Sequence, residues 1–271
     1  HTDNQAISAL FPSIVQLRND IVRRHNLARS IHLGAAGGLG DPQGVAAAFA
    51  MGADFVLTGS VNQGCIESGL DASGKALLAQ VQLGDVTMAP AADMFELGVE
   101  VQVLKRGSLF AQRAHKLYTL YRQYESLWDI PSTERKIVEQ SILQSTLEEA
   151  WSSTESYWSI RDTNEVRKAL QNPKHQMALV FRSYLGLSSR WAIEGTAERK
   201  LDYQIWCGPA MGAFNRWTEG SFLQSPENRT VVEVARNLME GASLLTRVQQ
   251  LRTFGVPVPS NAFVVRPRRL R

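Results

Sequence analysis

Apolar positions in the first sixty residues alternate between helical spacing and short buried runs. Residues 6–26 carry apolar side chains at helical intervals, which predicts one amphipathic helix. An apolar run at 31–35 predicts a buried strand. The pair Asp41-Pro42 predicts the start of a helix that ends near residue 51, because aspartate caps helices and proline suits the first helical position. A second buried strand is predicted at 55–58, so strand, helix and strand form a βαβ unit with parallel strands.

The rest of the chain is predicted to be mainly helical, without repeats. Residues 64–90 are mixed and polar and show no clear period. Helices are expected at 108–127, from Pro131-Ser132 onward, and around 165–171, 175–184 and 230–252. The prolines after Gly255 predict an extended segment that folds back over the body of the protein.

This order of elements predicts an α/β fold. The helix before the first strand is the crossover of a preceding βα unit, so we expect the chain to carry the last strands of a TIM (β/α)8 barrel. A mainly helical C-terminal region follows. We expect three parts: residues 1–107 as the C-terminal part of the barrel, 108–255 as a helical substrate or lid region, and 256–271 as an extended basic tail.

Composition and charge exclude several classes of protein. The chain is 44% hydrophobic and 20% charged with a net charge of +3, which is typical of a globular protein. Much of the positive excess lies in the tail arginines, so a nucleic-acid partner is not expected. The two cysteines, Cys65 and Cys207, lack metal-ligand spacing, which favours a reducing compartment and no metal site. Without a signal peptide or a long apolar run, we expect a cytoplasmic protein with no membrane partner.

Two glycine-containing loops follow the predicted parallel strands. Gly37-Gly38 ends the first strand, and Gly59-Ser60 ends the second. In a βα barrel the active site lies at the C-terminal ends of the strands, where backbone amides often hold a phosphate. A phosphate-bearing cofactor is therefore one interpretation, and tight turns without a ligand are the other.

Longer motifs carry a family resemblance. Gly34-Ala-Ala-Gly-Gly38 and Gly52-Ala-Asp-Phe-Val-Leu-Thr-Gly-Ser60 resemble the second half of the nitronate monooxygenase-like flavoproteins, which include an FMN-dependent enoyl-ACP reductase. Met88-Ala-Pro-Ala-Ala-Asp-Met-Phe-Glu96, Pro173-Lys-His-Gln-Met-Ala-Leu-Val-Phe-Arg182 and Asp202-Tyr-Gln-Ile-Trp-Cys-Gly-Pro-Ala-Met-Gly-Ala-Phe-Asn215 resemble the PfaD-type, trans-acting enoyl reductases of polyketide and polyunsaturated fatty acid synthesis. The resemblance extends from His1 to about Gly255.

This resemblance implies an enoyl-thioester (enoyl-ACP) reductase that acts in trans. NADPH would supply hydride through FMN to the β-carbon of an enoyl group on an acyl carrier protein, and a proton would reach the α-carbon. His1 matches the histidine of a loop beside the flavin, which makes it the candidate acid. The candidate cofactor-binding residues are Gly37, Gly38, Gly59, Ser60, Asn62 and Gln63.

The same resemblance implies further polypeptide as a partner, and two alternative functions stay open beside the reductase. The upstream half of the barrel, in the same gene product or another chain, is expected to complete the flavin site, and a homodimer stays open. One alternative is a nitronate monooxygenase-like flavin oxidase, against which the long helical region argues. The other is a flavin-free scaffold or docking subunit of a synthase, against which the two retained glycine loops argue.

Other conspicuous residues are given structural roles. Surface charge explains Lys105-Arg106 and Lys174-His175 better than attraction of a carrier protein. Core packing explains the aromatic residues Trp191, Trp206, Trp217 and Phe214. Helix capping explains Asp93 and Glu96 as well as catalysis does, and Cys207 is expected to be a buried thiol.

Overall fold

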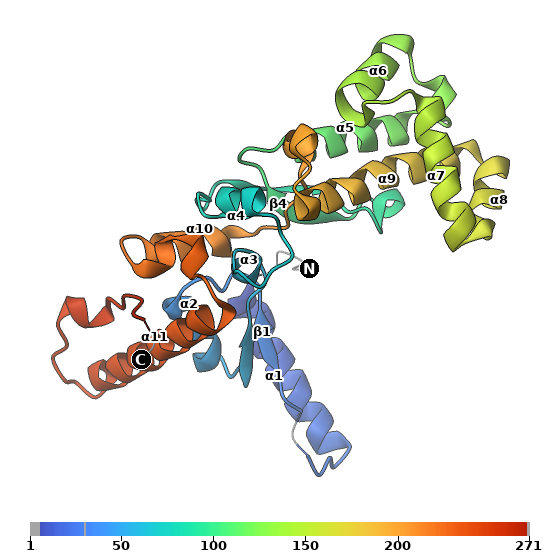
Figure 1. The fold of residues 1–271 in the computed structure, drawn as a ribbon. Helices are drawn as coiled ribbons and strands as arrows, with labels where there is room; N and C mark the ends of the chain where they lie inside the picture. Colours follow the sequence, from blue (N-terminus) through green and yellow to red (C-terminus); the bar gives the residue numbers. More distant parts are fainter. Residues whose placement is uncertain (1–5, 30, 270–271) are drawn as a thin grey trace. The chain divides into compact units, whose positions relative to one another are not determined.

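The computed structural model describes residues 6–29 and 31–269, which form two compact units (Figure 1). The first, here called the split unit, combines residues up to Asp85 with residues from Cys207 onward. The second, here called the continuous unit, runs from Val86 to Trp206. The chain therefore leaves the split unit once and returns to it.

The split unit opens with the predicted βαβ motif. Helix α1 (Ile7–Arg24) precedes strand β1 (Gly34–Ala36), helix α2 (Pro42–Ala50) and strand β2 (Phe55–Leu57). The strands are parallel, and their register pairs Gly34 with Phe55 and Ala36 with Leu57. The Asp41 carboxylate accepts a hydrogen bond from the Gly44 N–H at 2.8 Å, which confirms the predicted helix cap. The first strand is shorter than the predicted run at 31–35 and begins later.

Four further helices belong to the split unit. The short helices α3 (Ser60–Gln63) and α4 (Ala72–Leu78) follow β2 directly. Helices α10 (Pro209–Thr218) and α11 (Val231–Thr253) come from the end of the chain. Helix α11 packs along α2 (Figure 1). A Cβ atom at Gly241 would lie 2.6 Å from the Pro42 Cγ atom, so the two helices approach at a point that only glycine fits.

The proline-rich tail returns to these helices, as the sequence predicts. The Trp217 indole N–H donates to the Val265 carbonyl at 2.9 Å, and the Arg268 N–H donates to the Asn237 side chain at 2.8 Å. The tail includes one short 3-10 turn, at Ser260–Phe263.

The continuous unit combines an antiparallel hairpin with four main helices, of which α5 packs on the hairpin. Strands β3 (Val86–Pro90) and β4 (Glu100–Leu104) pair in antiparallel fashion. The helices are α5 (Phe110–Gln123), α7 (Leu147–Arg161), α8 (Thr163–Gln171) and α9 (Pro173–Glu194), with the short α6 (Ser132–Ile137) and a π-helical turn (Val138–Leu143) between α5 and α7. Helix α5 lies on β3 and against α9, and a buried core that includes Phe95, Phe110, Leu117 and Phe181 joins them.

Several sequence-based expectations differ from this structure. The segment 64–90 is not featureless, since it contains α4 and β3, and the hairpin partner β4 was not predicted either. Helices α7 and α10 were also missed. The compact units divide near residues 85 and 206. The roles given to 1–107, 108–255 and 256–271 stay predictions.

The fold is α/β and mainly helical. The described residues contain one parallel strand pair and one antiparallel pair, and these do not close a barrel. In the same part of the chain, no helix is long and apolar enough to cross a membrane.

Candidate functional site

The parallel pairing brings the two glycine loops to one edge of the split unit. Ala36 and Leu57 are the last residues of β1 and β2, and they are register partners. The segments that follow, from Gly37 and from Thr58, therefore leave the sheet at the same edge, as is usual for parallel strands. The structure thus places the loops that carry Gly37, Gly38, Gly59 and Ser60 at the same edge of the sheet, and their part in cofactor binding stays a prediction. Another predicted site residue, His1, lies outside the described residues.

The first loop has a backbone that requires glycine. Gly37 has φ +90° and Gly38 has φ +73°, a conformation that other residues rarely adopt. A Cβ atom at Gly38 would meet no other atom within 4 Å, so the loop borders open space. Beyond it, a Cβ atom at Gly40 would lie 1.9 Å from the Ala210 carbonyl oxygen, which fixes the loop against α10. Sequence reasoning missed the packing role of Gly40, because its partner lies far along the chain.

The second loop contains a glycine that borders open space and a serine whose hydroxyl oxygen accepts a backbone hydrogen bond. A Cβ atom at Gly59 would also meet nothing within 4 Å. The Ser60 Oγ atom accepts a hydrogen bond from the Gly208 N–H at 2.9 Å, so its own O–H stays available to donate. The Thr58 hydroxyl donates to the Asn62 Oδ1 atom at 2.8 Å. The loop therefore offers backbone amides and a hydroxyl donor, which are the groups that bind phosphate oxygens.

Asn62 and Gln63 lie further into helix α3. The Asn62 side chain is exposed and is held by Thr58, and the Gln63 carbonyl accepts from the Ser68 hydroxyl at 2.8 Å. Their predicted part in cofactor binding stays a prediction.

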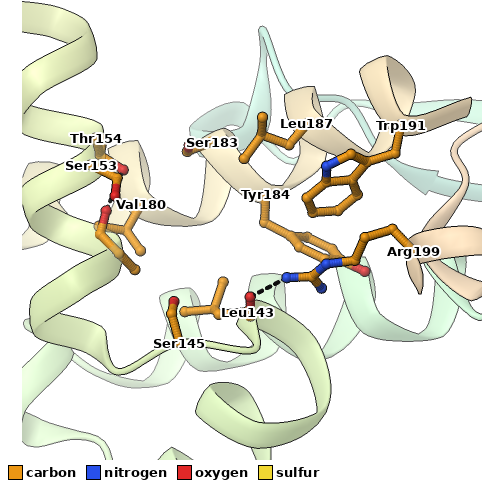
Figure 2. Close-up of a pocket in the computed structure, with 11 residues that line it drawn as sticks. Leu143, Ser145, Ser153, Thr154, Val180, Ser183, Tyr184, Leu187, Trp191 and Arg199 are labelled. Atoms are coloured by element: carbon orange, nitrogen blue, oxygen red, sulfur yellow. Dashed lines mark hydrogen bonds between the residues drawn. The ribbon is translucent and has the colours of Figure 1, made fainter. Parts of the chain in front are cut away.

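The continuous unit contains a separate small cavity between α7 and α9. Its volume is about 130 Å³. Leu143, Val180, Leu187 and Trp191 supply apolar walls, and Ser145, Ser153 and Ser183 add hydroxyl groups around the space (Figure 2). A mixed lining of this kind suits a small neutral group.

The arginine at this cavity already forms hydrogen bonds and an ion pair with groups of the protein. The Arg199 guanidinium lies 4.4 Å from the centre of the Trp191 ring and donates to the carbonyls of Ile142 and Leu143 (Figure 2). It also forms an ion pair with the buried Asp202 at 3.3 Å. Arg199 therefore holds the cavity wall in place and is not free to bind an anionic ligand.

Asp202 is the centre of this buried network. Its carboxylate pairs with Arg113 and Arg199 and accepts a hydrogen bond from the Tyr184 hydroxyl at 2.6 Å. Burial raises the pKa of Tyr184, and the neighbouring Asp202 charge raises it further. Tyr184 therefore stays protonated as a donor to Asp202, and the network is structural rather than acid–base.

The other conspicuous charged residues are also engaged in structure. Lys174 donates to the carbonyls of Tyr121 and Tyr124, and the His175 ring lies 2.9 Å from the Glu165 carboxylate. Within the described part of the chain, no cluster of three or more histidine, cysteine, aspartate or glutamate residues could hold a metal ion.

The remaining predictions for single residues have mixed outcomes. Glu96 does not cap a helix and instead pairs with Arg182 at 3.0 Å. Cys207 is buried, as predicted, and burial raises its pKa to about 12. Phe214 is buried and packs edge-on against the half-buried Trp217, whereas Trp206 is 46% exposed.

The chain is similar in sequence to proteins of polyketide and polyunsaturated fatty acid synthesis. It is 44% identical over 248 residues to the polyketide biosynthesis protein ThaF of Burkholderia thailandensis, covering 91% of this chain and 21% of that protein. It is 42% identical over 277 residues to a polyunsaturated fatty acid synthase polypeptide of Thraustochytrium sp., covering 98% of this chain and 18% of that protein. The chain thus spans about a fifth of the length of these curated relatives.

A solved structure extends the similarity to the fold. The enoyl reductase domain of MlnA, from the macrolactin biosynthesis cluster of Bacillus amyloliquefaciens, is 39% identical and superposes with a TM-score of 0.88. The match covers 93% of this chain and 57% of that one. Residues 124–203 match the inserted helical domain of [acyl-carrier-protein] S-malonyltransferase. That segment lies within the continuous unit, and the sequence reasoning had not related it to this domain. The fold of this chain is therefore that of the corresponding part of the MlnA enoyl reductase domain.

Proposed function

We propose that this chain is part of an FMN-dependent enoyl-thioester reductase that acts in trans on intermediates of polyketide or polyunsaturated fatty acid synthesis. The observation that carries the proposal is the similarity to the MlnA enoyl reductase domain over 93% of the chain. The fatty acid synthase polypeptide and the polyketide protein with similar sequences support the same setting. No feature of the described residues favours nitronate oxidation.

The edge formed by the two glycine loops fits the phosphate of FMN. Gly38 and Gly59 border open space that a side chain would fill, and the Ser60 hydroxyl can still donate. We assign Gly37, Gly38, Gly59 and Ser60 to the phosphate. When bound, FMN would accept hydride from NADPH and deliver it to the β-carbon of the enoyl thioester. His1 stays the predicted proton donor.

The proposed enzyme needs further polypeptide around the split unit. Leu10, Ile14 and Leu17 lie on one face of α1 and are 41%, 38% and 58% exposed, and Phe55 and Leu57 on β2 are 44% and 57% exposed. Apolar surface of this extent calls for cover. We propose that the other strands of a TIM barrel supply it, and that an acyl carrier protein brings the substrate.

A single loop substitution tests the phosphate assignment. Gly59 has φ −100°, which alanine adopts without strain, and its Cβ atom would meet no protein atom. In the intact protein, Gly59→Ala should therefore change the free energy of unfolding by less than about 1 kcal/mol. It should weaken FMN binding about tenfold in a fluorescence titration, because the methyl group occupies the phosphate position.

Gly69→Ala is the matched control. Gly69 lies in the same unit and also has no neighbour within 4 Å of an added Cβ atom, so FMN affinity should not change. Unchanged FMN affinity in Gly59→Ala would overturn the loop assignment. An intact protein that binds no FMN would overturn the proposed function.

A further inference from the structure

Arg229 is an unusual residue of the split unit because its charge is fully buried. Its side chain is 1% exposed and lies in the turn before α11. The guanidinium donates to the Leu223 carbonyl at 2.8 Å and to the Gln224 carbonyl at 3.0 Å, and it lies 5.1 Å from the centre of the Phe214 ring. The Nη1 atom has no hydrogen-bond partner among the described residues.

No described carboxylate forms an ion pair with this guanidinium. Burial lowers the pKa of Arg229 to about 10, and the charges of Cys65, when ionised, and of Glu227 oppose that shift only in part. The group therefore stays charged at neutral pH. Arg199 of the continuous unit is different, because its side chain is 13% exposed and is paired with Asp202. A buried cation without a paired anion is costly, so its retention calls for a compensating role.

The position of Arg229 indicates that role. Its unpartnered Nη1 atom lies 3.7 Å from the position of a Cβ atom at Gly64, the residue that ends helix α3. Its backbone carbonyl accepts from the Ile66 N–H at 2.9 Å. Two residues further on, the Val231 N–H donates to the Glu67 carboxylate at 3.0 Å. The segment Gly64–Glu67 is thus tied to the turn that carries Arg229.

The other end of the same short helix begins at the second glycine loop. Helix α3 starts at Ser60, after Gly59, and ends before Gly64. The four residues of helix α3 span about 6 Å. The buried charge therefore lies at the end of α3 that is opposite the loop we assign to the phosphate.

We propose that Arg229 is a positioning residue. It holds the Gly64 end of helix α3, opposite the second glycine loop, and supplies a buried positive field for an anionic phosphate at the two glycine loops. The inference rests on the proposed function, which provides the phosphate. Two unit charges about 10 Å apart, at an effective dielectric constant of about 20, interact strongly enough to change a dissociation constant about tenfold.

Riboflavin separates this role from a purely structural one, because it shares the ring system of FMN and lacks the phosphate. The full-length protein should bind FMN more tightly than riboflavin. In Arg229→Met, that preference should fall about tenfold while riboflavin affinity changes less than threefold. A variant that loses FMN and riboflavin affinity in parallel would show a structural role only and overturn the proposal. Wild-type protein that binds neither flavin would instead overturn the proposed function.

Arg247→Met is the matched control for net charge. Arg247 is exposed on α11, about 24 Å along the helix from its first residue, so its removal should leave the preference unchanged. An equal loss of preference in this variant would show a general charge effect and overturn the proposal.

Arg229→Lys provides a second route if the methionine variant does not fold. A buried lysine keeps the charge at neutral pH but has a lowered pKa, so it loses its proton as pH rises. The preference for FMN over riboflavin should therefore fall between pH 7 and about 9.5 in this variant and stay nearly constant in the wild type. A flat profile in the lysine variant would contradict a role for the charge.

Discussion

The two compact units of this chain bury their apolar side chains to different extents. The continuous unit has one core that joins its hairpin to its helices, with Phe95, Phe110 and Phe181 fully buried. The split unit has a cluster around Phe11 and Ala48 and also buries residues such as Leu78 and Phe214, but it leaves Leu17 and Leu57 more than half exposed. The difference between the units therefore lies in the exposed apolar faces of α1 and β2, for which we propose cover by further polypeptide.

The largest expected effect is the contrast between two phenylalanines. Phe181→Ala removes a fully buried ring from the core of the continuous unit and should lower the free energy of unfolding by about 3–5 kcal/mol. Phe55→Ala removes a ring that is 44% exposed, and in this chain it should cost less than about 1 kcal/mol. Urea denaturation of the two variants measures the difference.

The cost of the Phe55 variant can also be compared between this chain and a longer protein that contains it. If other barrel strands cover β2, Phe55→Ala should cost clearly more in the longer protein than in residues 1–271. Equal costs in the two proteins would contradict a covered face.

The buried network of the continuous unit should give the next largest effect. Asp202→Asn leaves Arg113 and Arg199 without their carboxylate and should cost about 3 kcal/mol, because it leaves two mostly buried guanidinium groups unpaired. Glu96→Gln is the control, since the Glu96–Arg182 pair is partly exposed and should contribute less than about 1 kcal/mol. Thermal unfolding measures both, and similar losses in the two variants would contradict the central role of Asp202.

The smallest expected effect concerns the thiol behind the second glycine loop. Burial raises the pKa of Cys65 from its usual 9.0 to about 11. The unfolded thiol ionises first as pH rises, so this contribution to stability is present below pH 9 and is lost between pH 9 and about 11. Folded protein should react slowly with iodoacetamide at about pH 8, because the thiolate is the reactive form. Reaction at the rate of unfolded protein would show that the split unit opens readily around Cys65.

Local signals were enough to predict the βαβ motif and its cap. Asp41-Pro42 starts a helix for reasons contained within a few residues, and parallel strands follow from a helical crossover. The two glycine loops could be found in the same way, because positive φ at Gly37 and Gly38 requires glycine.

The features that the sequence did not indicate depend on contacts between distant segments. Ser60 binds the Gly208 N–H from 148 residues away, and Gly40 is confined by the Ala210 carbonyl. The chain returns to the split unit at Cys207, and no periodicity of apolar residues in the sequence indicates this boundary. No local pattern in the sequence marks Arg229, and its burial follows from the fold. Long-range packing, rather than propensity, determines these positions.

The visible absorption spectrum of the intact protein tests the central claim most directly. Our account predicts an oxidised-flavin spectrum that NADPH bleaches and that a crotonyl thioester restores under anaerobic conditions, with FMN released on denaturation. A colourless protein that cannot be reconstituted with FMN would contradict it.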